Sequence, residues 1–337
     1  MDIRDYRLIK QTASARLSEA SYNPRRLVLI HTGIAFTLSL LAAVIHFAVT
    51  KQISGTGGLS GLGLRSILTT VQTVLQYAVA ILMPFWQIGF TAAMLATARG
   101  QSFTPKHILT KGFRRFSGVL GLELFRLALV SVLFIACIYL CSSIFVLTPM
   151  AAPFVQILEP ALQDSTVLAS GQLYLDDATL VAATEALIPL LIITGILMLL
   201  LLIPLIYRLG LAEFILMDEP RCGGLRAALT SAKRMRRNCF ALFRLDLSFW
   251  WFHLLLTITT VIGYLDLLLP ALGIPLPLDE DVAYFGFYIL HMLLQLGLFV
   301  WVKPHFVCSQ AVFYDNLMPE KSNPQPKPQN LPWDYQS

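Results

Sequence analysis

The strongest constraint on this chain is a set of six apolar runs, each long enough to cross a lipid bilayer. A helix needs ~20 residues to span the hydrocarbon core. Lipid cannot satisfy open backbone groups, so helices are the expected form of every run. We predict an all-α membrane protein with one transmembrane domain over residues 27–318. Its six spans cover residues 27–49, 70–97, 119–147, 187–208, 240–268 and 284–303.

Composition agrees with a bilayer environment. Apolar residues make up 56% of the chain and charged residues 13%, whereas soluble domains have ~45–50% and ~25%. The five cysteines form no CxxC pair, so we interpret them as free thiols without a disulfide or zinc framework. The net charge of +5 is explained by its placement around the spans, and we expect no nucleic-acid partner.

Basic residues lie almost entirely on one side of the six spans. Nineteen lysines and arginines occur in the N-terminal segment, the second and fourth connectors and the tail, against two in the first loop on the other side. Loop 148–186 has five acids and no base, and loop 269–283 has three acids and no base. Basic loops stay on the cytoplasmic side of a membrane. Both termini are therefore predicted to lie in the cytosol.

The two ends of the chain have different characters. Residues 1–26 show apolar positions at a helical period with basic residues on the other face, which fits an amphipathic helix on an anionic leaflet. Residues 319–337 are polar and rich in proline, a composition typical of a disordered tail.

Basic doublets and prolines suggest a weak threefold repeat of helical hairpins. An arginine doublet precedes each odd-numbered span, and a proline lies toward the cytosolic half of each even-numbered span. Each hairpin would comprise an amphipathic surface helix, a span out, an outer loop and a span back. The doublets are also our candidate contacts for lipid headgroups: Arg25, Arg26, Arg114, Arg115, Arg236 and Arg237. The prolines are Pro84, Pro204 and Pro304.

Several charges lie at membrane depth near the inner boundary, where each costs roughly 2.5–3.5 kcal/mol. Glu123 and Arg126 are three residues apart and can pair on one helix face. Three interpretations stay open: arginines reaching the headgroups, a structural charge network, or a substrate or proton site. The candidate network comprises Glu123, Arg126, Glu213, Arg244 and Asp246.

No motif points to chemistry. The glycine-rich stretch 55–63 lacks the Gly-Lys-Ser/Thr ending of a phosphate-binding loop. The histidines form no HExxH pattern, and we find no nucleophile elbow or carboxylate pair with a nearby base. We therefore predict no catalytic residue, no cofactor and no metal site.

Two segments carry a family resemblance. They read EFILMDEP…LRAALTSAKRMRRNCFALFRLDLSFWWFHLL, from residue 213, and VWVKPHFVCSQAVFYDNL, from residue 300. They resemble the bacterial membrane family called domain of unknown function 975. More distantly, the chain resembles the membrane domain attached to some bacterial glycerophosphodiester phosphodiesterases. The matching positions are Phe214, Ile215, Leu216, Asp218, Ser231, Leu247, Ser248, Phe249, Trp251, Pro304, Phe313 and Tyr314.

The resemblance implies a multi-pass protein of the bacterial inner membrane and supplies no catalytic residues. Three functions are compatible with the sequence. The first is a non-enzymatic module that binds anionic lipid, or a membrane or cytosolic partner protein, through its basic inner face. The second is a carrier or exporter of an amphipathic solute, and the third is a membrane-embedded enzyme that modifies lipids.

The charge asymmetry predicts a topology that labelling can test. A tag inserted at Ser165 should be reached by a membrane-impermeant reagent from outside intact cells, because loop 148–186 has no basic residue. Tags at either terminus should be reached only after the cells are permeabilised. Labelling of Ser165 and a terminus from the same side would contradict the six-span topology.

Overall fold

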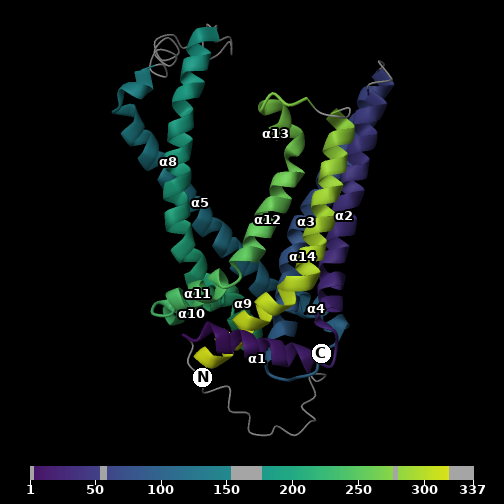
Figure 1. Ribbon diagram of the computed structural model, residues 1–337, viewed down its shortest axis with the longest axis vertical. Coiled ribbons are helices and arrows are strands. Elements are labelled where there is room, and N and C mark those ends of the chain that lie inside the picture. The colour runs from purple at the N-terminus through teal and green to yellow at the C-terminus, as the bar shows by residue number, and fades with distance from the viewer. Residues whose placement is uncertain (1–3, 54–58, 153–176, 276–279, 319–337) are drawn as a thin grey trace. The chain divides into compact units, whose positions relative to one another are not determined.

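The computed structural model describes residues 4–53, 59–152, 177–275 and 280–318 (Figure 1). These residues are helical and contain no strand. Two compact units are present: one combines residues 1–122 with 210–337, and the other contains residues 123–209. We call them unit 1 and unit 2. Most of loop 148–186 and the whole tail 319–337 lie outside the described residues.

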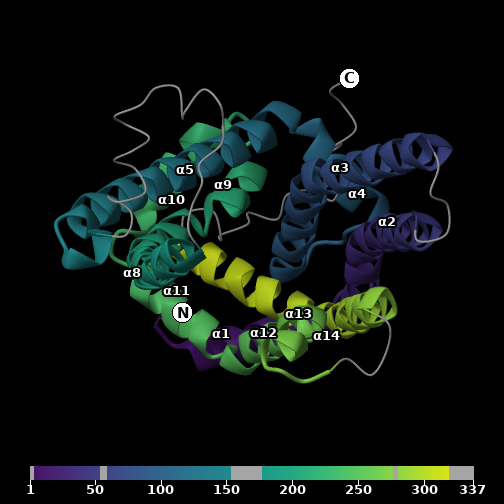
Figure 2. The ribbon, with the colours of Figure 1, turned by 90° about the horizontal axis from the view of Figure 1, so that it is seen from above.

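Unit 1 is built on long helices that pack side by side. Helix α2 lies between α3 and α14, and α14 also packs against α12 (Figure 2). Phe47 of α2 stacks on Phe285 of α14 with ring centroids 4.8 Å apart. Across the α12–α14 contact, His291 Nδ1 lies 2.6 Å from the carbonyl oxygen of Thr259. The bounds are Pro24–Ile53 for α2, Leu59–Ala98 for α3, Trp250–Gly263 for α12, Leu265–Ala271 for α13 and Glu280–Leu317 for α14.

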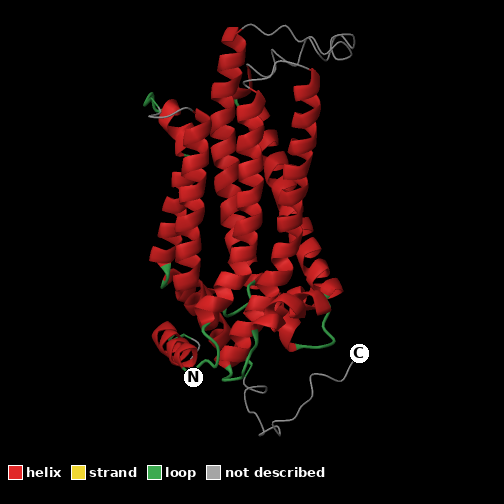
Figure 3. Ribbon diagram, turned by 90° about the vertical axis from the view of Figure 1, so that its right-hand side faces the viewer, coloured by secondary structure: helices red, strands yellow, loops and turns green. Residues whose placement is uncertain are grey.

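Short helices gather at one end of unit 1, which we call the basal end (Figure 3). Local signals in the sequence start two of them. Asp5 accepts hydrogen bonds from the backbone N–H groups of Arg7 and Leu8, which caps α1. Proline at position 105 occupies the first turn of α4, where its missing N–H costs nothing. The bounds are Tyr6–Ser18 for α1, Pro105–Arg114 for α4, Ala212–Asp218 for α9, Gly224–Met235 for α10 and Cys239–Leu247 for α11.

Unit 2 holds the greater part of α5, Phe116–Val146, followed by the short 3-10 helix η1, Pro149–Ala151. It ends with α8, Asp177–Leu209. The first turns of α5, up to Leu122, belong to unit 1. The predicted third and fourth spans fall on α5 and α8.

Five helices are long and apolar enough to cross a membrane, or six if one bent pair counts as a single span. The all-α class is therefore confirmed for the described residues, together with the presence of several helices that could span a membrane. The fifth predicted span, 240–268, differs from one continuous helix. It is divided into α11 and α12, whose axes differ by 65°, and then α13.

The bend between α11 and α12 combines a local hydrogen bond with two long-range contacts. The Ser248 hydroxyl donates to the carbonyl of Leu245 at 2.6 Å, a bond that competes with the regular helical pattern. The Ser248 carbonyl, freed at the break, accepts from Lys10 Nζ at 3.3 Å. Phe249, the next residue, is buried and meets Phe306 edge to face at 5.3 Å. Packing of Phe249 on α14 thus fixes the chain direction at the break.

The helix that contains the sixth predicted span is longer than the span. The helix α14 continues past Lys303 and Pro304 to Leu317. A proline removes one backbone hydrogen bond but need not end a helix. Burial of the turns that follow Pro304 offsets the loss of that hydrogen bond. Val312, Phe313 and Tyr314 are all buried. Pro84 and Pro204 likewise lie inside α3 and α8.

The apolar face of α1 is covered by protein. Ile9 and Ala13 are fully buried, and α1 packs against α14 and α3. The prediction for this segment was a helix resting on a lipid leaflet. The apolar side of α1 faces α14 instead, because a close-packed protein neighbour buries it as well as lipid would. Its exposed arginines, Arg4, Arg7 and Arg16, lie on the uncovered side.

Burial changes along α3. The turns before Phe85 carry exposed apolar residues such as Val74 and Ile81, whereas Phe85 to Ala98 are mostly buried. Large exposed apolar faces indicate contact with lipid or protein. The close-packed core of unit 1 therefore lies at its basal end.

Two glycines let α3 and α4 touch through their backbones. A Cβ at Gly89 would overlap the carbonyl oxygen of Ile108, and a Cβ at Gly112 would overlap that of Phe85. The same contact is flanked by a stack of Phe85 on Phe113, 5.0 Å apart. A larger side chain at either glycine would separate the two helices.

Replacing Gly89 by alanine should lower the free energy of unfolding by about 1–3 kcal/mol, because the added methyl group has no room. The matched control is Gly297→Ala on α14, where nothing lies within 4 Å of the added atom. Thermal unfolding of the two purified variants in the same detergent measures the difference. Equal melting temperatures would contradict the close contact.

Candidate functional site

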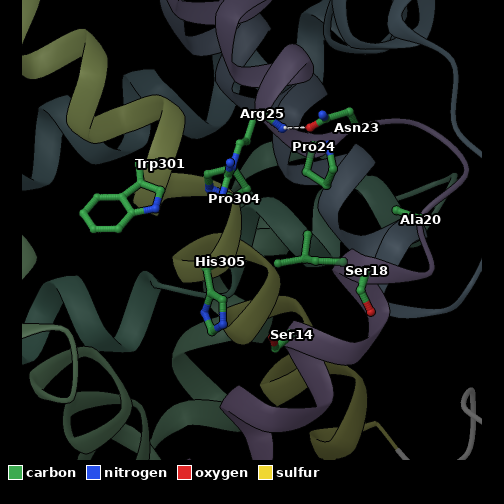
Figure 4. Close-up of a pocket in the computed structure, with 10 residues that line it drawn as sticks. Ser14, Ser18, Ala20, Asn23, Pro24, Arg25, Trp301, Pro304 and His305 are labelled. Carbon is green, nitrogen blue, oxygen red and sulfur yellow. Dashed lines mark hydrogen bonds between the residues drawn. The ribbon is translucent and has the colours of Figure 1, made fainter.

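A groove opens at the basal end between α1, the start of α2 and α14 (Figure 4). Its volume is about 490 Å³. Ser14 and Ser18 line it from α1, Arg25 from α2, and Trp301 and His305 from α14. The groove thus combines hydroxyls, a guanidinium and aromatic rings, which is a suitable set for a polar head attached to an apolar body.

Each polar group of this groove is placed by local structure. Asn23 Oδ1 accepts from the backbone N–H of Arg25 at 2.9 Å, which orients the first turn of α2. The Arg25 side chain is exposed. Trp301 is 63% exposed, as is typical of an aromatic residue at a membrane interface. The His305 Nδ1 atom is buried with no hydrogen-bond partner among the described residues.

A charge network joins three helices at the basal end. Arg99, just after α3, donates to Asp218 of α9 at 2.7 Å and to Asp315 of α14 at 2.8 Å. The Tyr314 hydroxyl also donates to Asp218, at 2.9 Å. Burial disfavours the charged guanidinium, but the two carboxylates outweigh it and raise the pKa of Arg99. Arg99 is therefore charged at every physiological pH, and its pairing is obligatory.

Residues that carry the family resemblance meet around this network. Phe214 stacks on Tyr314 with ring centroids 5.5 Å apart. The buried Ser231 accepts from the backbone N–H of Leu211 at 3.2 Å, which satisfies a donor at the start of α9. Together with Asp218, these side chains hold α9 between α10 and α14. Their role in this structure is to build the basal core.

A second, smaller cavity of about 240 Å³ lies on a different side of α14. Lys303 and Glu213 both line it, together with polar side chains from α3 and α14. The Glu213 carboxylate accepts from the Thr91 hydroxyl at 2.9 Å. The Lys303 ammonium lies 5.5 Å from the ring centre of Phe90 and 5.2 Å from that of Phe299.

The five residues of the predicted charge network lie in both units. Arg126 donates to Glu123 at 2.8 Å within α5, and both belong to unit 2. In unit 1, Arg244 lies over the ring of Tyr6 at 5.7 Å, and Asp246 accepts from Gln310 at 3.1 Å. Glu213 lines the smaller cavity. The pair on α5 thus forms as its spacing suggests, and the contacts of Arg244 and Asp246 described here are with Tyr6 and Gln310.

The predicted headgroup contacts differ in exposure. Five of the six arginines have exposed side chains, and Arg115 is half-buried. Arg115 donates to the backbone carbonyl of Glu219 at 3.0 Å, and burial lowers its pKa. Arg115 therefore ties the start of α5 to the end of α9. The exposed set is Arg25, Arg26, Arg114, Arg236 and Arg237.

The sequence analysis does not identify three charged residues of these sites, which are Arg99, Lys303 and Asp315. Arg99 and Asp315 read as ordinary basic and acidic flanks of two spans, and Lys303 reads as the end of the last one. One usable signal is the glycine that follows Arg99, because a helix often ends at a glycine with positive φ. Gly100 has a φ of 69° directly after α3, which places Arg99 at a helix end. The partners of Arg99 lie 119 and 216 residues away, so no local pattern reveals them.

Metal ligands do not cluster in the part of the chain that the structure describes. No group of three or more histidine, cysteine, aspartate or glutamate side chains there is arranged to hold an ion. The side chains that line the two cavities can bind a ligand by hydrogen bonding and charge pairing.

The long apolar helices and the charge-paired basal core define a polytopic helical membrane protein. The chain belongs to the family described as "Protein of unknown function (DUF975)", whose model matches residues 7–321. No curated protein and no solved structure matches the chain. The more distant similarity to phosphodiesterase membrane domains stays a prediction.

Substituting Arg99 tests the importance of the charge network. Arg99→Gln should lower the free energy of unfolding by about 3 kcal/mol, because it removes the cation that pairs with two close carboxylates. Asp315→Asn should cost less, since Asp218 still pairs with Arg99. Arg236→Gln, at an exposed position, is the control and should cost almost nothing. Chemical or thermal unfolding in detergent would rank the three, and an equal effect of all three would refute the network.

Proposed function

We propose that this protein is a non-enzymatic module of the bacterial inner membrane that binds anionic lipid at its basal end, which faces the cytosol. The groove between α1, α2 and α14 carries the proposal. An anionic headgroup would meet Arg25 and the hydroxyl of Ser14, beside Ser18, whose own hydroxyl donates to the carbonyl of Ala15 at 2.7 Å. The acyl chains would pass the exposed ring of Trp301.

The polar side of the groove suits a phosphate. Guanidinium groups and hydroxyls are common donors to phosphate oxygens. A buried ring nitrogen without a partner, as in His305, is expected where a ligand or water supplies the missing bond. Arg26 adds a second exposed positive charge directly beside Arg25.

The surface helices support the same orientation. On α10, Ala227, Ala228 and Ser231 are buried, while Arg226 and Lys233 are exposed. Each such basic residue adds about 1 kcal/mol of attraction to an anionic leaflet. We also propose that α1, α4 and α10 are the surface helices of three related hairpins, because each precedes a membrane-length helix or bent helix pair.

A second candidate function is a carrier of an amphipathic solute. The cavity that contains Glu213 and Lys303 favours it, because charged residues at membrane depth mark solute pathways in transporters. Retention of lipid by the basal groove does not depend on this cavity, since no residue lines both.

Lipid retention tests the proposed function. The full chain in nanodiscs should bind added phosphatidylglycerol more tightly than phosphatidylcholine, and the preference should weaken as salt rises. Arg25→Gln combined with Arg26→Gln removes two charges and should weaken phosphatidylglycerol binding by about 2 kcal/mol, or about 30-fold. Native mass spectrometry of the retained lipids measures both effects.

Two tryptophans offer a matched control. Trp301 and Trp250 are exposed to a similar extent, at 63% and 60%, but only Trp301 lines the groove. Trp301→Ala should weaken lipid retention, and Trp250→Ala should leave it nearly unchanged. Equal retention of the two lipids by the unsubstituted chain, or insensitivity to the arginine changes, would overturn the proposal.

A further inference from the structure

The smaller cavity places opposite charges among aromatic walls. Glu213 stands at the first turn of α9, and Lys303 stands on α14 next to Pro304. The chain is apolar on both sides of Lys303, so an ammonium there carries a high desolvation cost. The cavity therefore brings a cation and a carboxylate, which attract each other, to the walls of one space.

Each charge is held in place by a neighbour on another part of the wall. The Thr91 hydroxyl donates to Glu213 Oε2 at 2.9 Å. The Lys303 ammonium is positioned by the faces of Phe90 and Phe299, an arrangement that orients a cation by its attraction to the rings. The two charged groups are thus fixed around the same space.

The rest of the wall is divided between polar and apolar groups. Gln87 and Gln310 add amide groups, and Gln310 is oriented by its hydrogen bond to Asp246 at 3.1 Å. Phe214, Phe252 and Phe306 supply apolar rings. The volume of about 240 Å³ is below the ~300–1,000 Å³ of sites for drug-sized ligands, so the occupant is a small molecule or a single headgroup.

We propose that this cavity binds a small zwitterion, with Lys303 contacting its anionic group and Glu213 its ammonium group. The phenylalanine rings would accept an apolar part of the same ligand. An apolar amino acid and the phosphoethanolamine head of a lipid share this chemistry. A zwitterion presents an opposite charge to each residue at once, whereas a singly charged ligand would be attracted by one residue and repelled by the other.

Equilibrium binding to the full chain in nanodiscs tests the proposal. The two probes are tritiated leucine and glycerophosphoethanolamine, each measured separately. Saturable binding of leucine would identify a free amino acid as the source of the zwitterion, and binding of glycerophosphoethanolamine alone would identify a lipid headgroup. Saturable binding of neither probe at millimolar concentration would overturn the proposal.

Analogues separate direct contact from a structural role. For leucine, leucinamide lacks the carboxylate and 4-methylpentanoate lacks the ammonium. For glycerophosphoethanolamine, ethanolamine lacks the phosphate and glycerol 3-phosphate lacks the ammonium. Lys303→Met should weaken binding of the complete zwitterion about tenfold or more and remove the preference for the anionic group. Glu213→Gln should weaken binding similarly and remove the preference for the ammonium group.

Controls keep these outcomes interpretable. Lys111→Met removes another lysine seated on a ring, that of Phe103 at 4.8 Å, but this lysine lies outside the cavity and should leave binding unchanged. Size-exclusion profiles and melting temperatures show whether each variant is folded. If folded Lys303→Met and Glu213→Gln both lower binding of all analogues equally, or change none of it, the two residues do not contact the ligand and the proposal fails. The Arg25 and Arg26 variants should bind the zwitterion normally.

Discussion

The basal core of unit 1 depends on the pairing of one cation, Arg99, with Asp218 and Asp315. A guanidinium that is mostly removed from water is stable only with close counter-charges, and these two carboxylates come from α9 and α14. The end of α3 is therefore tied to two helices that follow it by more than a hundred residues. Both the groove and the smaller cavity are lined by α14, whose basal half this network anchors.

Close packing and lipid exposure divide the unit along its helices. Near the basal end, backbone contacts at Gly89 and Gly112 leave no room between α3 and α4, and α1 buries its apolar side on α14. Farther along α3, side chains such as Val74 and Ile81 are exposed. An apolar solvent can cover those faces without shape complementarity, so specific packing is required only where polar groups must be satisfied. Both candidate sites lie in that region.

Much of the fold was predictable because hydrophobic length is a local property. A run of ~20 apolar residues predicts a membrane-spanning helix wherever it occurs in a sequence. The three-residue spacing of Glu123 and Arg126 similarly predicts their ion pair on α5. The bend at Ser248 was not predictable, because it depends on Lys10 and on Phe306, which lie far away in the sequence. The continuation of α14 past Pro304 also depends on tertiary burial, which no local pattern shows.

The sequence alone determined the class of protein, a helical chain that passes several times through a membrane, because the cost of apolar surface in water and of open backbone in lipid acts residue by residue. The tertiary structure alone decided which charges meet. Arg115 turned out to bind a backbone carbonyl while its neighbour Arg114 is exposed, and Lys303 and Glu213 came to share one cavity. Electrostatic partners interact when they lie within a few ångströms of each other in space. The number of residues between them in the sequence does not reveal whether they are that close.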